Sequence, residues 1–314
     1  VWKNSEPGET AEPPESGDEI GGFRLESELG RGVTGIVFRA HGAQDPQPVA
    51  LKVARFTSGS NWKLNTRFRQ EAEILAGLDH PQIVRYINHG VDGRRQFLAM
   101  ELLAGPSLQQ VLGGGPLPVS LAVPLALQLG RAVCYLHRKF ILHRDLQASN
   151  ILFDGERSVR IIDFSLALPQ LGDADLSSLN RIIGPRNCLP PESAAAARSD
   201  LGPECDLYAL GGVIYHMLCG RPPFPQERSE NPCSSATGQA VPVRQVRPEV
   251  PRDLEAVVMR CLAPSPLDRF AVGEELCDEL RRIERRTPVD SHHYTLWERL
   301  SLGMSRWRTR SSSR

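Results

Sequence analysis

The tripeptide His-Arg-Asp at residues 143–145 constrains this chain more than any other feature, because two further polar groups follow it at fixed spacing. Asn150 lies five residues after Asp145, and Asp163 begins the tripeptide Asp-Phe-Ser thirteen residues later. One aspartate can accept a proton from a hydroxyl group, and the other polar groups can bind a metal ion through oxygen. His-Arg-Asp alone is common by chance, but this ordered set is not.

Three glycines upstream, Gly30, Gly32 and Gly35, lie between two segments with the alternating pattern of strands. Glycine lets a turn bring its main-chain N–H groups close to phosphates. The pattern is weak by itself, since a plain hairpin fits as well, and a strand rather than a dinucleotide-binding helix follows. Lys52 ends the next strand. A lone lysine there is usually solvated, but its spacing from the glycines favours a phosphate ligand.

Together these motifs resemble the eukaryotic-type (Hanks-type) protein kinase family over about residues 23–285. Gly220-Arg221-Pro222-Pro223-Phe224 looks most like bacterial serine/threonine kinases. Glu192 resembles the end of the activation segment. Asp206 resembles the buried acid that anchors the catalytic loop, and Arg269 resembles the arginine that pairs with Glu192.

The resemblance implies ATP and Mg²⁺ as cofactors and a protein as substrate. It implies Asp145 as the catalytic base and Asn150 and Asp163 as the metal ligands. It also pairs Lys52 with an acid on the next helix. Glu71 fits that position best. The alternative, Glu73, does not lie on the same face of the helix. The residues implied to contact the nucleotide are Gly30, Gly32, Gly35, Val37, Ala50, Lys52, Met100, Glu101, Leu103 and Leu152.

Within that set, the segment Met100-Glu101-Leu102-Leu103 resembles the hinge of the family. Main-chain groups of Glu101 and Leu103 would bond the adenine, with Met100 at the back of the pocket and Val37 against the base. Without the other motifs, a strand that ends in a loop would be the preferred interpretation.

The fold that these motifs require is α+β and bilobal: a small β-rich N-lobe with one main helix, then a larger, mainly α-helical C-lobe. We place the N-lobe and hinge at residues 23–103 and the C-lobe at 104–285. An acidic, disordered segment is expected at 1–22 and a basic tail at 286–314. The patterns predict strands at 23–25, 35–40, 49–54, 83–87 and 96–103, and helices at 65–78, 121–136, 207–218 and 254–262.

Composition limits the partners and the compartment. The chain carries 37 basic and 37 acidic residues, so nothing global favours nucleic acid. No run reaches the ~18 uninterrupted apolar residues of a membrane helix, and no signal peptide is evident. Seven cysteines without a C-x-x-C spacing suggest reduced thiols and a cytoplasmic location.

Three departures from the family pattern cluster around the transferred phosphate. Gln147 stands where serine/threonine kinases carry a lysine, and Pro185 where they carry a threonine bonded to that lysine. Ser165 replaces the glycine after Asp-Phe. Loss of one transition-state cation typically costs ~3–4 kcal/mol, although glutamine still donates a neutral hydrogen bond.

Three functions remain open. The first is a serine/threonine protein kinase, with activity that the departures would reduce. The second is a nucleotide-binding pseudokinase that acts as a scaffold or allosteric regulator, and the third is a kinase-like enzyme acting on a small molecule. Retention of all the implied catalytic and metal-binding residues favours the first. Ser177 or Ser178 is a candidate phosphorylation site that would order the activation segment through Arg144, with an ordinary polar loop as the equal alternative.

The tail is basic, with nine arginines against three acids in residues 281–314. Leu296, Trp297, Leu300, Met304 and Trp307 recur at roughly helical spacing, so this segment could lie on an anionic membrane surface. A helix folded back on the core, or a frayed end, is the favoured alternative.

Overall fold

The structure, a computed structural model, divides the chain into two compact units that are each interrupted in sequence. Unit 1 comprises Val1–Ser107, Phe140–Asp145 and Asn150–Ile183, and unit 2 comprises Leu108–Lys139, Leu146–Ser149 and Gly184–Arg314. This differs from the single boundary after residue 103 that the sequence suggested. The residues that the structure describes are 13–42, 47–55, 62–155, 157–169, 190–194, 201–224 and 240–291.

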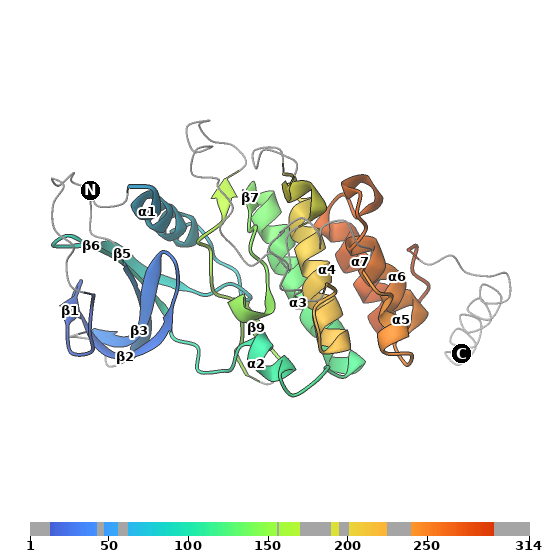
Figure 1. Cartoon of the computed structure of the whole chain (residues 1–314), viewed down its shortest axis with the longest axis horizontal. Helices are drawn as coiled ribbons and strands as arrows, with labels where there is room; N and C mark the ends of the chain where they lie inside the picture. Colours follow the sequence, from blue (N-terminus) through green and yellow to red (C-terminus); the bar gives the residue numbers. More distant parts are fainter. Residues whose placement is uncertain are drawn as a thin grey trace, which may run out of the picture. The chain divides into compact units, whose positions relative to one another are not determined.

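Unit 1 is built around an antiparallel sheet with the strand order β1-β2-β3-β4-β6-β5 (Figure 1). The predicted strands are present, some of them longer than expected or shifted. Their bounds are β1 Glu19–Ile20, β2 Phe23–Arg31, β3 Gly35–Gly42, β4 Pro48–Ala54, β5 Tyr86–Asp92 and β6 Arg95–Glu101. The strand expected at 83–87 begins only at Tyr86, since Ile83 makes an isolated bridge with Ile161 instead.

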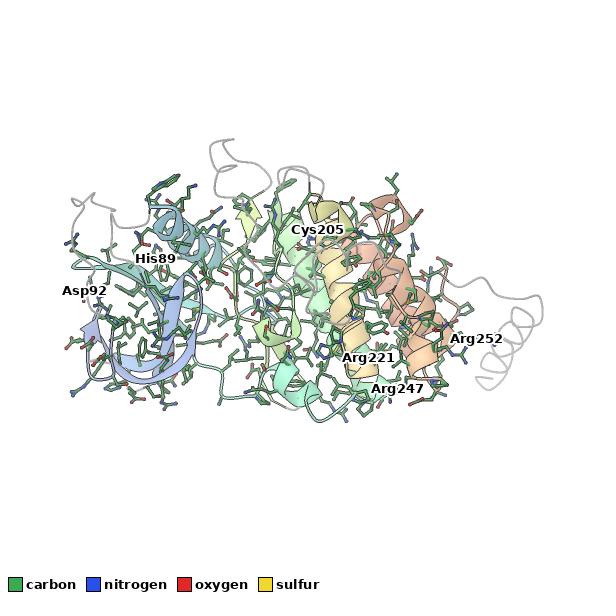
Figure 2. The ribbon with its side chains drawn as sticks, viewed as in Figure 1. His89, Asp92, Cys205, Arg221, Arg247 and Arg252 are labelled. Atoms are coloured by element: carbon green, nitrogen blue, oxygen red, sulfur yellow. The ribbon has the colours of Figure 1, made fainter. Side chains whose placement is uncertain are left out.

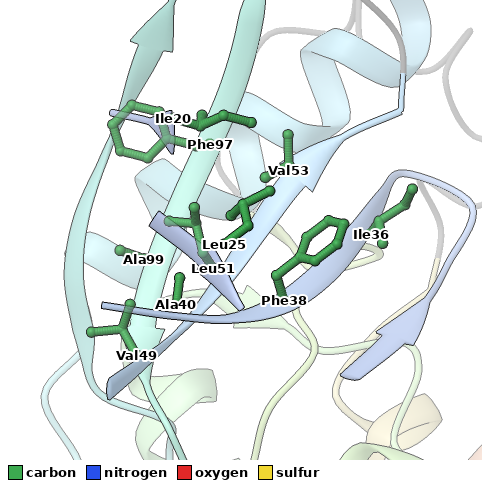
Figure 3. Packing of buried hydrophobic residues seen from close by; sticks show 10 residues of the cluster. All are labelled: Ile20, Leu25, Ile36, Phe38, Ala40, Val49, Leu51, Val53, Phe97 and Ala99. Carbon is green, nitrogen blue, oxygen red and sulfur yellow. The ribbon is translucent and has the colours of Figure 1, made fainter. Parts of the chain in front are cut away.

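One face of this sheet buries an apolar cluster because alternate strand residues point to the same side. Ile36, Phe38 and Ala40 of β3 are all at most 2% exposed. They pack with side chains from the neighbouring strands in one cluster (Figure 3). Its members are Ile20, Leu25, Ile36, Phe38, Ala40, Val49, Leu51, Val53, Phe97 and Ala99. The cluster holds β3 and β4 in the register that sets Val37 opposite Lys52.

The N-terminal segment differs from the prediction. We expected disorder through residue 22, but Glu19–Ile20 pairs with β2 and Ile20 is 5% exposed. Gly21 adopts a positive φ of 63°, and a Cβ there would collide with the ring of Phe97. A buried isoleucine next to an obligatory glycine therefore attaches residues 19–21 to the sheet.

Helix α1 runs over Trp62–Ala76, three residues earlier at its start than the periodicity of 65–78 indicated and two residues shorter at its end. Phe68, Glu71, Ala72 and Leu75 are buried along one face. The glutamate on that apolar face is Glu71, and a buried charge of this kind requires a partner.

The described remainder of unit 1 includes two pairs of short strands. Strand β7 (Ile141–Leu142) pairs with β10 (Leu168–Pro169), and β8 (Ile151–Phe153) pairs with β9 (Val159–Ile161). The 3₁₀ turn η1 (Ala148–Asn150) leads directly into β8.

Unit 2 is helical in the part described, as predicted. Its elements are α2 Leu108–Leu112, α3 Val119–Arg138, η4 Pro191–Ala194, α4 Glu204–Cys219, α5 Val243–Val246, α6 Arg252–Cys261, η6 Pro266–Asp268 and α7 Gly273–Glu284. By length and composition alone α3 could cross a membrane, but most of its apolar window is buried within the protein. The core helix of a globular protein passes the same test.

Small residues let the helices of unit 2 approach closely. A Cβ at Gly130 would lie 2.8 Å from the sulfur of Cys277, and one at Gly273 would lie 2.7 Å from the sulfur of Cys134. The two sulfurs are 3.9 Å apart and both thiols are free.

A partly buried arginine also joins separate segments of unit 2. Arg247, labelled in Figure 2, donates to the main-chain carbonyls of Leu117 and Leu218.

Two adjacent glycines of α4 provide a matched test of this packing. A Cβ at Gly211 would collide with Cys261, whereas one at Gly212 would only reach Pro223 at 3.9 Å. Both changes to alanine gain helix propensity of up to ~1 kcal/mol, but overpacking costs about 1–3 kcal/mol. We expect Gly211→Ala to have a free energy of unfolding about 1–3 kcal/mol below that of Gly212→Ala in urea melts. Equal free energies of unfolding for the two variants would show that α4 and α6 can move apart at little cost.

Candidate functional site

A buried ion pair between Lys52 on β4 and Glu71 on α1 is the centre of the candidate site. The Lys52 ammonium lies 2.7 Å from both carboxylate oxygens of Glu71. Lys52 is 6% exposed and Glu71 is 2% exposed. Glu73 is more than half exposed and faces Arg69 at 3.9 Å. The prediction that Glu71 rather than Glu73 pairs with Lys52 is therefore confirmed.

Asp163 approaches the same lysine from the segment after β9. Its Oδ1 lies 3.7 Å from the Lys52 ammonium and accepts a hydrogen bond from the Ser165 main-chain N–H at 3.0 Å. The Ser165 side chain also lowers the pKa of this carboxylate. The main-chain N–H would be present with the family's glycine as well, so the serine itself adds only this effect on the pKa, which sequence reasoning missed.

Burial and charge act on these three groups in opposite directions. Burial alone would lower the pKa of Lys52, but Glu71 and Asp163 outweigh it and raise that pKa. Burial raises the pKa of Glu71 to about 7 although Lys52 pulls it down. Burial would also raise the pKa of Asp163, but Lys52 and the Ser165 N–H lower it below its ordinary value. Asp163 is therefore ionised at neutral pH. Glu71, with a pKa of about 7, gains or loses its proton near neutral pH.

Asp145 and Asn150 lie side by side in the same unit. The Asn150 amide donates to the main-chain oxygen of Asp145 at 3.0 Å and to its carboxylate at 2.9 Å. Arg144 adopts a positive φ of 63°, an uncommon conformation for a residue with a side chain. The buried ring of His143 packs edge-on against Phe164 with centroids 5.0 Å apart. This contact ties residues 143–145 to the residue that follows Asp163.

The glycine-rich turn joins β2 to β3 and is closed by a hydrogen bond from the Gly32 N–H to the Gly35 carbonyl at 2.8 Å. A Cβ at Gly35 would lie 2.8 Å from the Val53 carbonyl oxygen, whereas one at Gly30 would meet nothing within 4 Å. Glycine is thus obligatory at Gly35 for close approach to β4.

The residues expected around an adenine lie on β3, β4, β6 and β8. Ala50 is opposite Met100 in the β4–β6 ladder, and Met100 is buried. The N–H of Glu101 donates to the Arg85 carbonyl at 3.0 Å, so only its carbonyl could serve a base. Leu103 and Leu152 are half-buried in the same unit.

In unit 2 the structure forms the predicted pair between Arg269 and Glu192. The Arg269 guanidinium donates to both carboxylate oxygens of Glu192 at 2.7 and 2.8 Å, and its face lies 4.6 Å from the ring of Tyr208. The fully buried Asp206 bonds the ring of His137 at 2.9 Å. The predicted role of Asp206 in anchoring the catalytic loop stays a prediction.

Several predictions fall on residues outside those that the structure describes. These are Pro185, the candidate phosphorylation sites Ser177 and Ser178, and the amphipathic tail pattern from Tyr294 to Arg308.

Comparisons with known proteins agree with this geometry. The family model described as the protein kinase domain matches residues 23–280. The serine/threonine-protein kinase pkn2 of Myxococcus xanthus is 33% identical, covering 83% of this chain and 32% of that protein. The serine/threonine-protein kinase PknL of Mycobacterium tuberculosis is 30% identical, covering 89% of this chain and 72% of that protein.

The crystal structure of a double mutant of the Mycobacterium tuberculosis PknI kinase domain shares the fold, with a TM-score of 0.67 and 24% identity over 86% of this chain and 99% of that chain. The chain spans less than half the length of several curated relatives, for example 43% of the serine/threonine-protein kinase PrkC of Bacillus subtilis. A family match that covers most of the sequence, on a site with this geometry, leads to one conclusion: the chain belongs to the protein kinase family.

Proposed function

We propose that this chain transfers the γ-phosphate of Mg·ATP to a serine or threonine hydroxyl of a protein substrate. The observation that carries the proposal is the buried Lys52–Glu71 pair with Asp163 beside it, in the same compact unit as Asp145 and Asn150. The names of the curated relatives, serine/threonine-protein kinases, support the class of acceptor.

The phosphates of the nucleotide are the expected ligands of Lys52. Phosphoryl transfer depends mainly on positioning and on neutralising charge. Glu71 fixes the ammonium group on the sheet, and the low dielectric of a buried site strengthens its attraction for phosphate oxygens. The main-chain N–H groups of the Gly30–Gly35 turn are the second phosphate-binding element.

The donors present fit a magnesium ion. Mg²⁺ is usually held by one or two carboxylates together with substrate phosphates, rather than by an all-protein cage. Asp163 offers an ionised carboxylate and Asn150 offers a carboxamide oxygen. When bound, the ion would neutralise charge on the transferring phosphate.

Asp145 is the proposed base that orients the acceptor hydroxyl and accepts its proton. The Asn150 amide donates a hydrogen bond of 2.9 Å to the Asp145 carboxylate and so fixes the rotamer of that side chain. A pre-oriented carboxylate loses less freedom when the substrate arrives.

A pseudokinase is the second candidate, and Gln147 is the observation that favours it. The position carries no positive charge, so charge on the transferring phosphate is stabilised less than in kinases with lysine. Such a protein would bind Mg·ATP through Lys52 and Asp163 without appreciable transfer.

Incubation with labelled ATP, Mg²⁺ and generic protein substrates separates the two candidates. We expect phosphoserine and phosphothreonine as products. Asp145→Asn should abolish transfer while keeping the thermal stabilisation by Mg·ATP, which reaches ~2.7 kcal/mol at a hundredfold excess over Kd. Lys52→Met should lose both. Nucleotide binding without transfer would support the pseudokinase, and no thermal shift at millimolar Mg·ATP would contradict both candidates.

Gln147→Lys restores the cation of the family and should raise the rate of transfer, by up to ~10²-fold. Gln109→Lys adds the same charge on the exposed side of α2 and serves as the control. The rates are compared at saturating ATP. A lower rate in Gln147→Lys would show that the glutamine has a role of its own.

Affinity for Mg·ATP should rise with pH around neutrality because Glu71, with a pKa of about 7, must ionise to pair with Lys52. The folded chain holds this proton between pH 4.5 and about 7, so the contribution of Glu71 to the free energy of unfolding falls as pH rises through that window.

Isothermal titration from pH 6 to 8 measures the effect on binding. The wild type and Glu73→Gln should share the rise, and Glu71→Gln should retain only the smaller change due to the nucleotide itself. Identical profiles for all three proteins would show that Glu71 does not control the lysine.

A further inference from the structure

The side chain of Glu101 makes contacts that its expected role at the nucleotide does not use. It lies at the end of β6 and is 16% exposed. One carboxylate oxygen accepts hydrogen bonds from the Arg160 guanidinium and from the Arg85 main-chain N–H, both at 2.6 Å. The expected adenine contacts of Glu101 involve its main chain alone, so this carboxylate serves another purpose.

Arg160 holds two carboxylates at once. On β9, its Nη1 donates to Glu101 and its Nε donates to Asp154 at 2.7 Å. The side chain is 22% exposed. The Arg85 guanidinium is 4.0 Å from Glu101 and mostly exposed, so it adds little. Arg160 therefore links the end of β6 to the β8–β9 hairpin through charge-assisted hydrogen bonds.

The hairpin to which Arg160 belongs also fixes the other end of the 101–107 segment. Leu152, an expected adenine contact, lies opposite Arg160 in the ladder. The Phe153 N–H donates to the Pro106 carbonyl at 2.9 Å, and a Cβ at Gly105 would collide with the Phe153 carbonyl. The stretch between Glu101 and Gly105 is thus attached to the hairpin at both ends.

We propose that Arg160 is a positioning residue for the adenine base, acting through the side chain of Glu101. By fixing that carboxylate, Arg160 holds the main-chain groups of Glu101 and Leu103 in place for the base. Leu152, which lies on the same hairpin, keeps its place relative to them. This inference rests on the proposed binding of ATP.

The effect should be confined to the adenine end of the nucleotide. Among the described residues, Lys52 and Asp163, the expected contacts of the phosphates and metal, form no hydrogen bond or ion pair with Arg160, Glu101 or Asp154. A ligand with phosphates but without a base therefore separates positioning of the base from general damage to the fold.

The test measures Kd for Mg·ATP and for Mg·tripolyphosphate, together with KM for ATP and kcat, in the full chain. Arg160→Met keeps the stem of the side chain and removes its charge. Glu101→Gln keeps the shape and main chain of Glu101 and provides the second variant should Arg160→Met fold poorly. Arg39→Met is the control, because Arg39 forms an exposed 2.6 Å ion pair with Glu26 on the same sheet.

We expect Arg160→Met and Glu101→Gln each to raise the Kd and KM for ATP by roughly tenfold. This is the change in affinity that loss of one hydrogen bond to a charged group typically causes. Affinity for tripolyphosphate and kcat should stay unchanged, and Arg39→Met should match the wild type. Unchanged ATP affinity in both variants, or equal losses for ATP and tripolyphosphate, would overturn the inference. A wild type that binds neither ligand would instead overturn the proposed function, and this inference with it.

Discussion

Two opposite charges buried together, Lys52 and Glu71, determine much of the rest of unit 1. Either charge alone in that apolar setting would be strongly destabilising, so the strand and the helix that carry them must meet in one geometry. Gly35 permits that meeting, because a side chain there would press on the Val53 carbonyl beside Lys52. The antiparallel sheet and its apolar cluster therefore serve to hold one ammonium group at a defined place.

The lysine is shared between two carboxylates that differ in character. Glu71 is more deeply buried, and burial raises its pKa to about 7 against the pull of Lys52, whereas Asp163 is held ionised by Lys52 and by Ser165. One acid is thus suited to setting the position of the lysine and the other to binding a cation. At the other end of the expected nucleotide, Arg160 performs a comparable task for Glu101. Charged pairs of this kind fix position more than they add stability.

The motifs and long periodic segments were predictable from the sequence because they depend on spacing along the chain. The Lys52–Glu71 and Arg269–Glu192 pairs follow from motif identity, and helices α3, α4 and α6 of unit 2 from their apolar period, whereas α7 was not predicted. The ordering of Ile20, the main-chain bond from Ser165 to Asp163 and the bridge made by Arg160 were not predictable. Each depends on a partner brought close only by folding, and an arginine on a short strand looks like any solvated residue.

The central claim is that Glu71 acts on the nucleotide only by holding Lys52. A double-mutant cycle on the Kd for Mg·ATP, with Lys52→Met, Glu71→Gln and the combined variant, tests it most directly. We predict that each single change weakens binding and that adding Glu71→Gln to Lys52→Met weakens it no further. Losses that simply add would contradict the claim, because they would give Glu71 a contribution independent of the lysine.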